Sequence, residues 1–99
     1  MNGTIKTYAI IAFTYNGKRY TKTVNRSEMD LTTDPNTWFW YFDEDGLHFE
    51  VWGSVDDQGN PLTSSMTQVV GFAVNVYEPV NGYNEWTDQV DDIDVIERV

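Results

Sequence analysis

The sequence contains no cysteine, only three prolines, one histidine and a single basic residue after position 26. Without cysteine the protein has no disulfide, no zinc–thiolate site and no thiol nucleophile. The lone histidine, His48, excludes a metal site built on two or three histidines. The longest apolar run, Tyr8 to Phe13, has six residues, whereas a membrane-spanning helix needs about 20.

The 99 residues fit one domain, residues 1–99. Hydrophobic residues make up 40% of the chain and include four Trp, six Tyr and five Phe, which can supply a core. No charged-then-apolar leader opens the chain, so we expect a cytoplasmic location in a host cell.

The charge is divided unevenly along the chain. Residues 1–26 carry five bases and no acid, a charge of +5, whereas residues 27–99 carry sixteen acids and only Arg98, a charge of −15. Such a surface repels phosphates and anionic membranes, so we expect neither nucleic acid nor membrane as a direct partner. It favours a basic protein surface as partner, the alternative being that the acidity serves only colloidal stability.

Two hairpins are predicted in the first half of the chain. Asn16-Gly17 separates two segments with strand composition, Thr4–Tyr15 and Lys18–Val24, and this dipeptide favours a type I′ turn. A second pair of strands, Trp38–Phe42 and Leu47–Val55, flanks a turn at Asp43–Gly46. Between the hairpins, one short helical turn is predicted near residues 27–31.

The second half alternates between loops and strands. Residues 56–61 and the segment Pro79–Asn84 have the composition of loops, and Thr67–Glu78 that of a strand. The tail fits either a helix or a terminal strand, and its Asp and β-branched residues favour a strand over Asp92–Arg98. We therefore predict an all-β fold, a small antiparallel β-sandwich or partly open barrel of five to six strands.

The chain offers little for catalysis. Ser54, the nucleophile nearest His48 on the same strand face, is six residues away, or about 20 Å. A glycosidase built on Glu50 would need a deep cleft, and the calcium-like run Asp43–Gly46 is followed by Trp52 where a ligating Glu is required. We predict no enzymatic activity, no cofactor and no metal.

A docking surface for a basic protein is the leading functional prediction. Acids crowd the turns and the tail, and two aromatic residues beside the last loop have the character of interface anchors. Acids on one strand face recur every ~6.6 Å, close to twice the ~3.4 Å rise per nucleotide, so such a face can act as a nucleic-acid mimic. The predicted partner-binding residues are Asp43, Glu44, Asp45, Asp56, Asp57, Tyr83, Trp86, Asp88, Asp91, Asp92 and Asp94.

In size and charge alone, the chain resembles phage-encoded anti-defence proteins, including anti-CRISPR inhibitors, many of which are small and acidic. That likeness implies an inhibitor that occupies a basic, nucleic-acid-binding groove.

Two other functions remain open. A carbohydrate-binding module, or a structural module of a phage or cell surface, would use Trp38, Trp40 and Trp52 as a stacking platform. A homodimer would pair the basic first hairpin of one copy with the acidic body of another, unless Lys18, Arg19 and Lys22 meet those acids within one chain.

Overall fold

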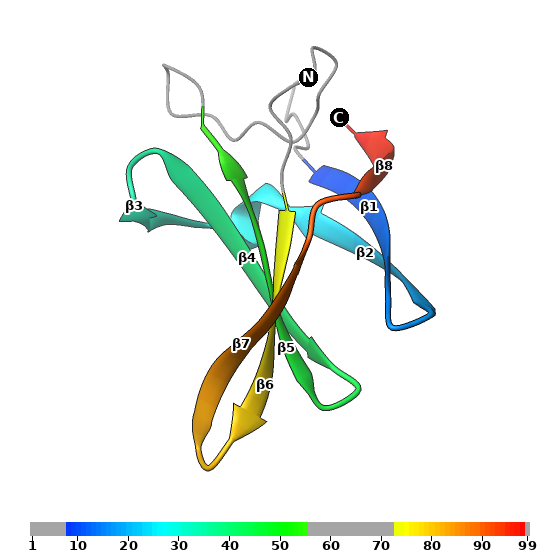
Figure 1. The fold of residues 1–99 in the computed structure, drawn as a ribbon. Coiled ribbons are helices and arrows are strands. Elements are labelled where there is room, and N and C mark those ends of the chain that lie inside the picture. The colour runs from blue at the N-terminus through cyan, green and yellow to red at the C-terminus, as the bar shows by residue number, and fades with distance from the viewer. Residues whose placement is uncertain (1–7, 56–72, 99) are drawn as a thin grey trace, which may run out of the picture.

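A computed structural model describes residues 8–55 and 73–98, which form two antiparallel β-sheets (Figure 1). The chain order is β1 (Tyr8–Tyr15), β2 (Lys18–Asn25), the 3-10 turn η1 (Arg26–Glu28), β3 (Asp30–Asp34), β4 (Thr37–Glu44), β5 (Leu47–Ser54), β6 (Ala73–Val80), β7 (Tyr83–Val90) and β8 (Asp94–Arg98). The prediction of a small antiparallel all-β fold is confirmed.

The smaller sheet has the strand order β2-β1-β8, and the larger sheet has the order β3-β4-β5-β6-β7. The larger sheet is a meander, in which each strand pairs with the next one along the chain. The chain returns to the smaller sheet only with β8, which pairs with β1 and leaves β7 as the last strand of the larger sheet.

The core lies between the two sheets. Ile11 and Phe13 of β1 belong to the same buried cluster as Trp38 of β4 and Phe49 and Val51 of β5. Alternate residues of these strands point inward because successive side chains in a strand face opposite ways.

Three two-residue turns build the hairpins. Asn16-Gly17, Asp45-Gly46 and Asn81-Gly82 all have positive φ at both positions, as a type I′ turn requires. The first two confirm the predicted hairpins, although Asp43 and Glu44 belong to β4 rather than to the turn. The predicted loop at Pro79–Asn84 is wrong: its only turn residues are Asn81-Gly82, because Asn-Gly here closes a hairpin between β6 and β7.

The described residues form eight strands rather than the five or six that were predicted. Besides the extra hairpin, residues 30–34 form a short strand along the edge of β4, and this strand confines the helical turn to Arg26–Glu28 instead of residues 27–31. The predicted terminal strand is confirmed as β8. The predicted loop at 56–61, and residues 67–72 of the predicted strand, lie outside the described residues.

Candidate functional site

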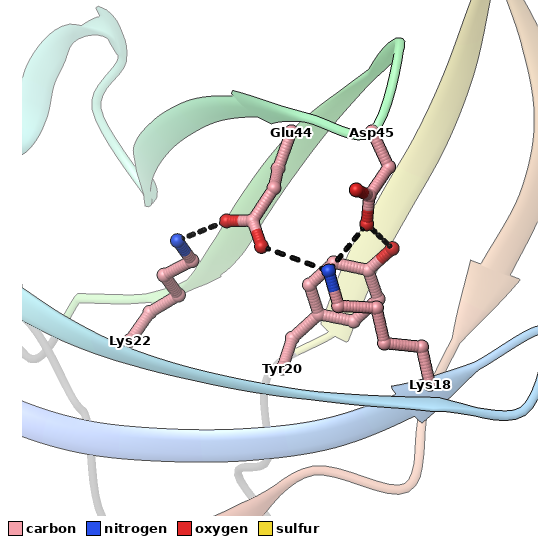
Figure 2. A network of polar contacts seen from close by, with 5 residues as sticks. All are labelled: Lys18, Tyr20, Lys22, Glu44 and Asp45. Carbon is pink, nitrogen blue, oxygen red and sulfur yellow. Dashed lines mark hydrogen bonds and ion pairs between the residues drawn. The ribbon is translucent and has the colours of Figure 1, made fainter.

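Two acids of the predicted docking surface are paired with the first hairpin (Figure 2). Lys18 Nζ lies 2.6 Å from Asp45 Oδ2 and 3.2 Å from Glu44 Oε2, and Lys22 Nζ contacts Glu44 Oε1. The Tyr20 hydroxyl also donates a hydrogen bond of 2.9 Å to Asp45 Oδ2. The network forms because the turn of the β4–β5 hairpin lies against β2.

The ion pairs of this network lower the pKa values of its two acids and raise the pKa of Lys18. Hydrogen bonds from Lys22 and Lys18 hold the pKa of Glu44 below its ordinary value, and those from Lys18 and Tyr20 do the same for Asp45. The same contacts raise the pKa of Lys18, with Asp45 as the largest cause. All three groups are therefore charged at neutral pH, and their charges largely cancel one another locally.

A third acid of the predicted set is also paired. Arg19 Nη2 donates to Asp94 Oδ2 at 2.6 Å, which joins β2 to the start of β8 across the smaller sheet. The basic first hairpin thus meets the acidic body within one chain at Glu44, Asp45 and Asp94.

The remaining acids of the described residues include Asp88 on β7 and Asp91 and Asp92, which follow it; all three are exposed. Asp88 accepts a hydrogen bond from the backbone N–H of Gln89, and Asp91 accepts one from the side-chain amide of Gln89, so both of these described donors are neutral groups. No Lys or Arg occurs between residues 27 and 97, and no described cation pairs with these acids. Asp56 and Asp57 lie outside the described residues.

The register of the β6–β7 hairpin adds two acids that the sequence-based prediction left out. Glu78 of β6 and Glu85 of β7 are cross-strand partners and both are exposed. Like charges placed directly opposite each other destabilise a sheet. The signal for this pair was the Asn81-Gly82 turn, since a two-residue turn sets residue 78 opposite residue 85.

The same register separates the two predicted anchors. Tyr83 pairs with Val80 and Trp86 pairs with Tyr77, and residues 77 and 80 of one strand point to opposite faces. Tyr83 therefore shares the core-side face with Glu78 and Glu85, whereas Trp86 lies on the outer face. Both remain exposed, at 77% for Tyr83 and 56% for Trp86.

The core-side face of this hairpin is exposed because nothing described packs on it. Figure 1 shows β6 and β7 extending past the end of the smaller sheet. Val74 and Val76, nearer the sandwich, are fully buried, whereas β7 is exposed at every position except Val90. The hairpin thus projects as a two-stranded ribbon with an acidic face.

The outer face of the larger sheet carries a polar and aromatic row. The carboxylate of Glu50 accepts hydrogen bonds from Asn75 at 3.0 Å and from the Tyr77 hydroxyl at 3.2 Å. His48 stacks on Tyr41, with ring centroids 5.7 Å apart. Burial, followed by the charge of Glu50, raises the pKa of both tyrosines.

Asp43 lies at the end of this row, where its Oδ1 is 2.7 Å from Nδ1 of His48. The pair borders an open hollow of about 500 Å³, lined by Asp43, Gly46, Leu47, His48, Pro79 and Asn84. A histidine oriented by a carboxylate resembles part of a catalytic triad, but none of these lining residues is a nucleophile. Within residues 8–55 and 73–98, no three His, Asp or Glu side chains are grouped as metal ligands would be.

The three tryptophans of the predicted glycan platform do not share a face. Trp38 is fully buried and Trp40 packs against the core, whereas Trp52, the partner of Phe39, points to the outer face. A stacking surface made of these three side chains is therefore not present.

Comparisons with protein-family models, with curated proteins and with solved structures found no match for this chain. In the part of the chain that the structure describes, no helix has the length and apolar character needed to cross a membrane.

Proposed function

We propose that this chain is a non-enzymatic binding protein that docks the acidic β6–β7 hairpin and the segment after it onto a basic surface of a partner protein. The contact set is centred on Glu78, Glu85 and Asp88, with Asp91 and Asp92 beside them and Tyr83 and Trp86 as anchors. The observation that carries the proposal is the exposed Glu78–Glu85 pair, because two like charges face each other there and no described cation pairs with them.

A basic partner would relieve this repulsion. A Lys or Arg placed between Glu78 and Glu85 turns an unfavourable cross-strand pair into two favourable contacts. The acids draw the partner in, and burial of the large rings of Tyr83 and Trp86 adds affinity at short range.

An acidic docking hairpin of this kind can also act as an inhibitor. Basic grooves that bind nucleic acid hold rows of Lys and Arg for the phosphates, and an acidic hairpin can occupy such a groove in their place. We extend the proposal to this case, in which the chain acts as a nucleic-acid mimic of the kind expected of an anti-defence protein.

The test compares three forms of the full chain immobilised at low ionic strength: the wild type, Glu85→Lys and the matched control Glu28→Lys. Both variants change the net charge equally, and Glu28 is exposed on η1, away from the hairpin (Figure 1). Because Glu28 accepts hydrogen bonds from Asn25 and Trp40, the Tm of each variant is measured first. Proteins captured from the host lysate by the wild type are purified, and their affinities are then measured directly as salt rises.

The proposal expects Glu85→Lys to weaken binding about tenfold, and it expects Glu28→Lys to bind like the wild type. Binding by the wild type should also fall as salt is added, since exposed charges are screened beyond about 8 Å at physiological ionic strength. Equal losses in both variants, or an affinity independent of salt, would contradict the proposal.

A second candidate function is glycan binding on the outer face of the larger sheet. It is favoured by the exposed rings of Tyr41 and Trp86 beside the hydrogen-bonding groups of Glu50 and Asn75, a platform different from the one predicted. Titration with a glycan panel, with and without Trp86→Ala, tests it through tryptophan fluorescence. A panel that leaves the fluorescence unchanged removes this candidate.

A further inference from the structure

We propose that the partner contributes an extended basic segment that pairs with β7 and becomes the sixth strand of the larger sheet. This inference rests on the proposed function and specifies how the partner binds. It begins from the strand order, in which β7 is terminal and pairs with β6 alone among the described strands.

β7 is well suited to accept a strand. It has eight residues, about 26 Å at ~3.3 Å per residue, and it is exposed at seven of them. No described strand pairs with its outer edge, and a row of free N–H and C=O groups is a template for another strand. Peptide recognition by strand addition uses such an edge, with main-chain hydrogen bonds for affinity and alternate side chains for specificity.

The two faces of β7 define the partner's sequence pattern. On the core-side face an added strand meets Glu85 and Asp88, which share that face because the β6–β7 register shifts at Thr87, a residue without a partner in β6; on the outer face the strand meets Trp86. Because side chains of a strand alternate between faces, the matching segment carries Lys or Arg at every second position and apolar residues between them. The anchors Tyr83 and Trp86 lie on opposite faces of the hairpin. A strand added along the edge of β7 can contact both of them, whereas a flat protein surface that packs on one face can contact only one.

The charges of β7 also select against a second copy of this chain. In an antiparallel self-pair centred on Trp86 and Thr87, Glu85 of each copy lies opposite Asp88 of the other, and like charges in that position repel. The basic residues of the first hairpin that would reverse this repulsion, Lys18, Arg19 and Lys22, are engaged inside the chain. The occupant that fits is therefore a foreign basic strand.

The test uses the full chain and four end-capped eight-residue peptides. The first alternates Lys and Val, and a block control has the same composition as four Lys followed by four Val. Two further peptides repeat the alternating sequence with N-methyl groups on the Lys amides only or on the Val amides only. In an added strand, one of these two sets of amides faces β7 and the other faces solvent.

The readout is affinity together with amide hydrogen exchange, residue by residue, on the labelled chain. Strand addition predicts that the alternating peptide slows exchange of β7 amides at least tenfold. It also predicts that one N-methylated peptide binds at least tenfold more weakly, while the other binds within about twofold of the parent. The block peptide should bind more weakly than the alternating one.

Three results would overturn the inference. Equal binding of both N-methylated peptides without slower exchange in β7 means docking by side chains alone; strand addition then fails while the proposed function stands. Failure of every peptide to bind at low salt also overturns strand addition, and the capture experiment above then decides the proposed function separately. If amide exchange in β7 slows as the protein concentration rises, in the absence of any peptide, then the strand that pairs with β7 comes from a second copy of this chain.

Discussion

Replacing Phe49 by alanine should strongly destabilise the core. Phe49 of β5 is fully buried, and its ring centroid lies 4.6 Å from that of Phe42, 5.0 Å from Tyr20, 5.8 Å from Phe13 and 6.3 Å from Tyr15. These rings come from β1, β2 and β4, so Phe49 ties the two sheets together.

The expected cost follows from this packing. A buried Phe→Ala substitution costs about 3–5 kcal/mol, and four ring contacts place Phe49→Ala near 4 kcal/mol. A domain of this length has a free energy of unfolding of about 5–15 kcal/mol, so the variant keeps a small margin or none. With a urea m-value of about 2 kcal/mol/M, the unfolding midpoint should fall by about 2 M.

Urea unfolding followed by tryptophan fluorescence measures the loss. Tyr41→Ala is the matched control, since Tyr41 lies on the outer face of the same sheet, is 43% exposed and stacks on Phe39 and His48. It should cost about 1 kcal/mol. Phe49→Leu keeps much of the apolar volume but loses the ring contacts, so it should cost less than Phe49→Ala and give a measurable value if the alanine variant is unfolded. Equal costs for Phe49→Ala and Tyr41→Ala would refute the reasoning.

Three further predictions concern ionisable groups. Hydrogen bonds from the hydroxyl of Thr33 and the N–H of Thr32 lower the pKa of Asp30 to about 2, which an NMR titration of the carboxyl measures. The stabilising effect of this carboxylate is therefore present above its ordinary pKa of 3.8 and is lost as the pH falls through about 2. The pKa of Glu44 is lowered by Lys22 and Lys18, so the Tm difference between the wild type and Glu44→Gln should shrink as salt is added, and a difference that salt leaves unchanged would contradict the network. Burial raises the pKa values of Tyr41 and Tyr77 above 10, so absorbance should show late tyrosine titration, and their contribution to stability should be lost as the pH rises beyond 10.

Turn dipeptides and the alternation of apolar residues correctly predicted the first two hairpins. Asn16-Gly17 and Asp45-Gly46 adopt the positive φ values that their residue types allow, and alternation placed Phe49 and Val51 inward. Asn81-Gly82 carries the same signal, and the loop prediction failed there because neighbouring Pro79 and the polar residues outweighed it. Proline is tolerated in β6 because only its backbone N–H is missing, and Pro79 lies next to the hairpin turn.

The functional residues were harder to predict, because counting charges in the sequence does not show which acids form ion pairs with Lys or Arg. The sequence predicted eleven contact residues from their type and clustering. Which acids are compensated depends on contacts over long sequence distances, such as Lys18 with Asp45 and Arg19 with Asp94. Glu78 and Glu85 were overlooked for the same reason, since their opposition appears only once the strand register is known.

Composition and turn chemistry by themselves determined that this chain forms antiparallel hairpins with an aromatic interior and a large excess of negative charge. These properties are local or additive, so each residue contributes to them independently of its distant neighbours. Only the tertiary structure decided where that charge remains uncompensated. Folding brings the cations of the first hairpin to the β4–β5 turn and to β8. It leaves the β6–β7 ribbon beyond their reach, with its acids exposed and with no described strand along the outer edge of β7.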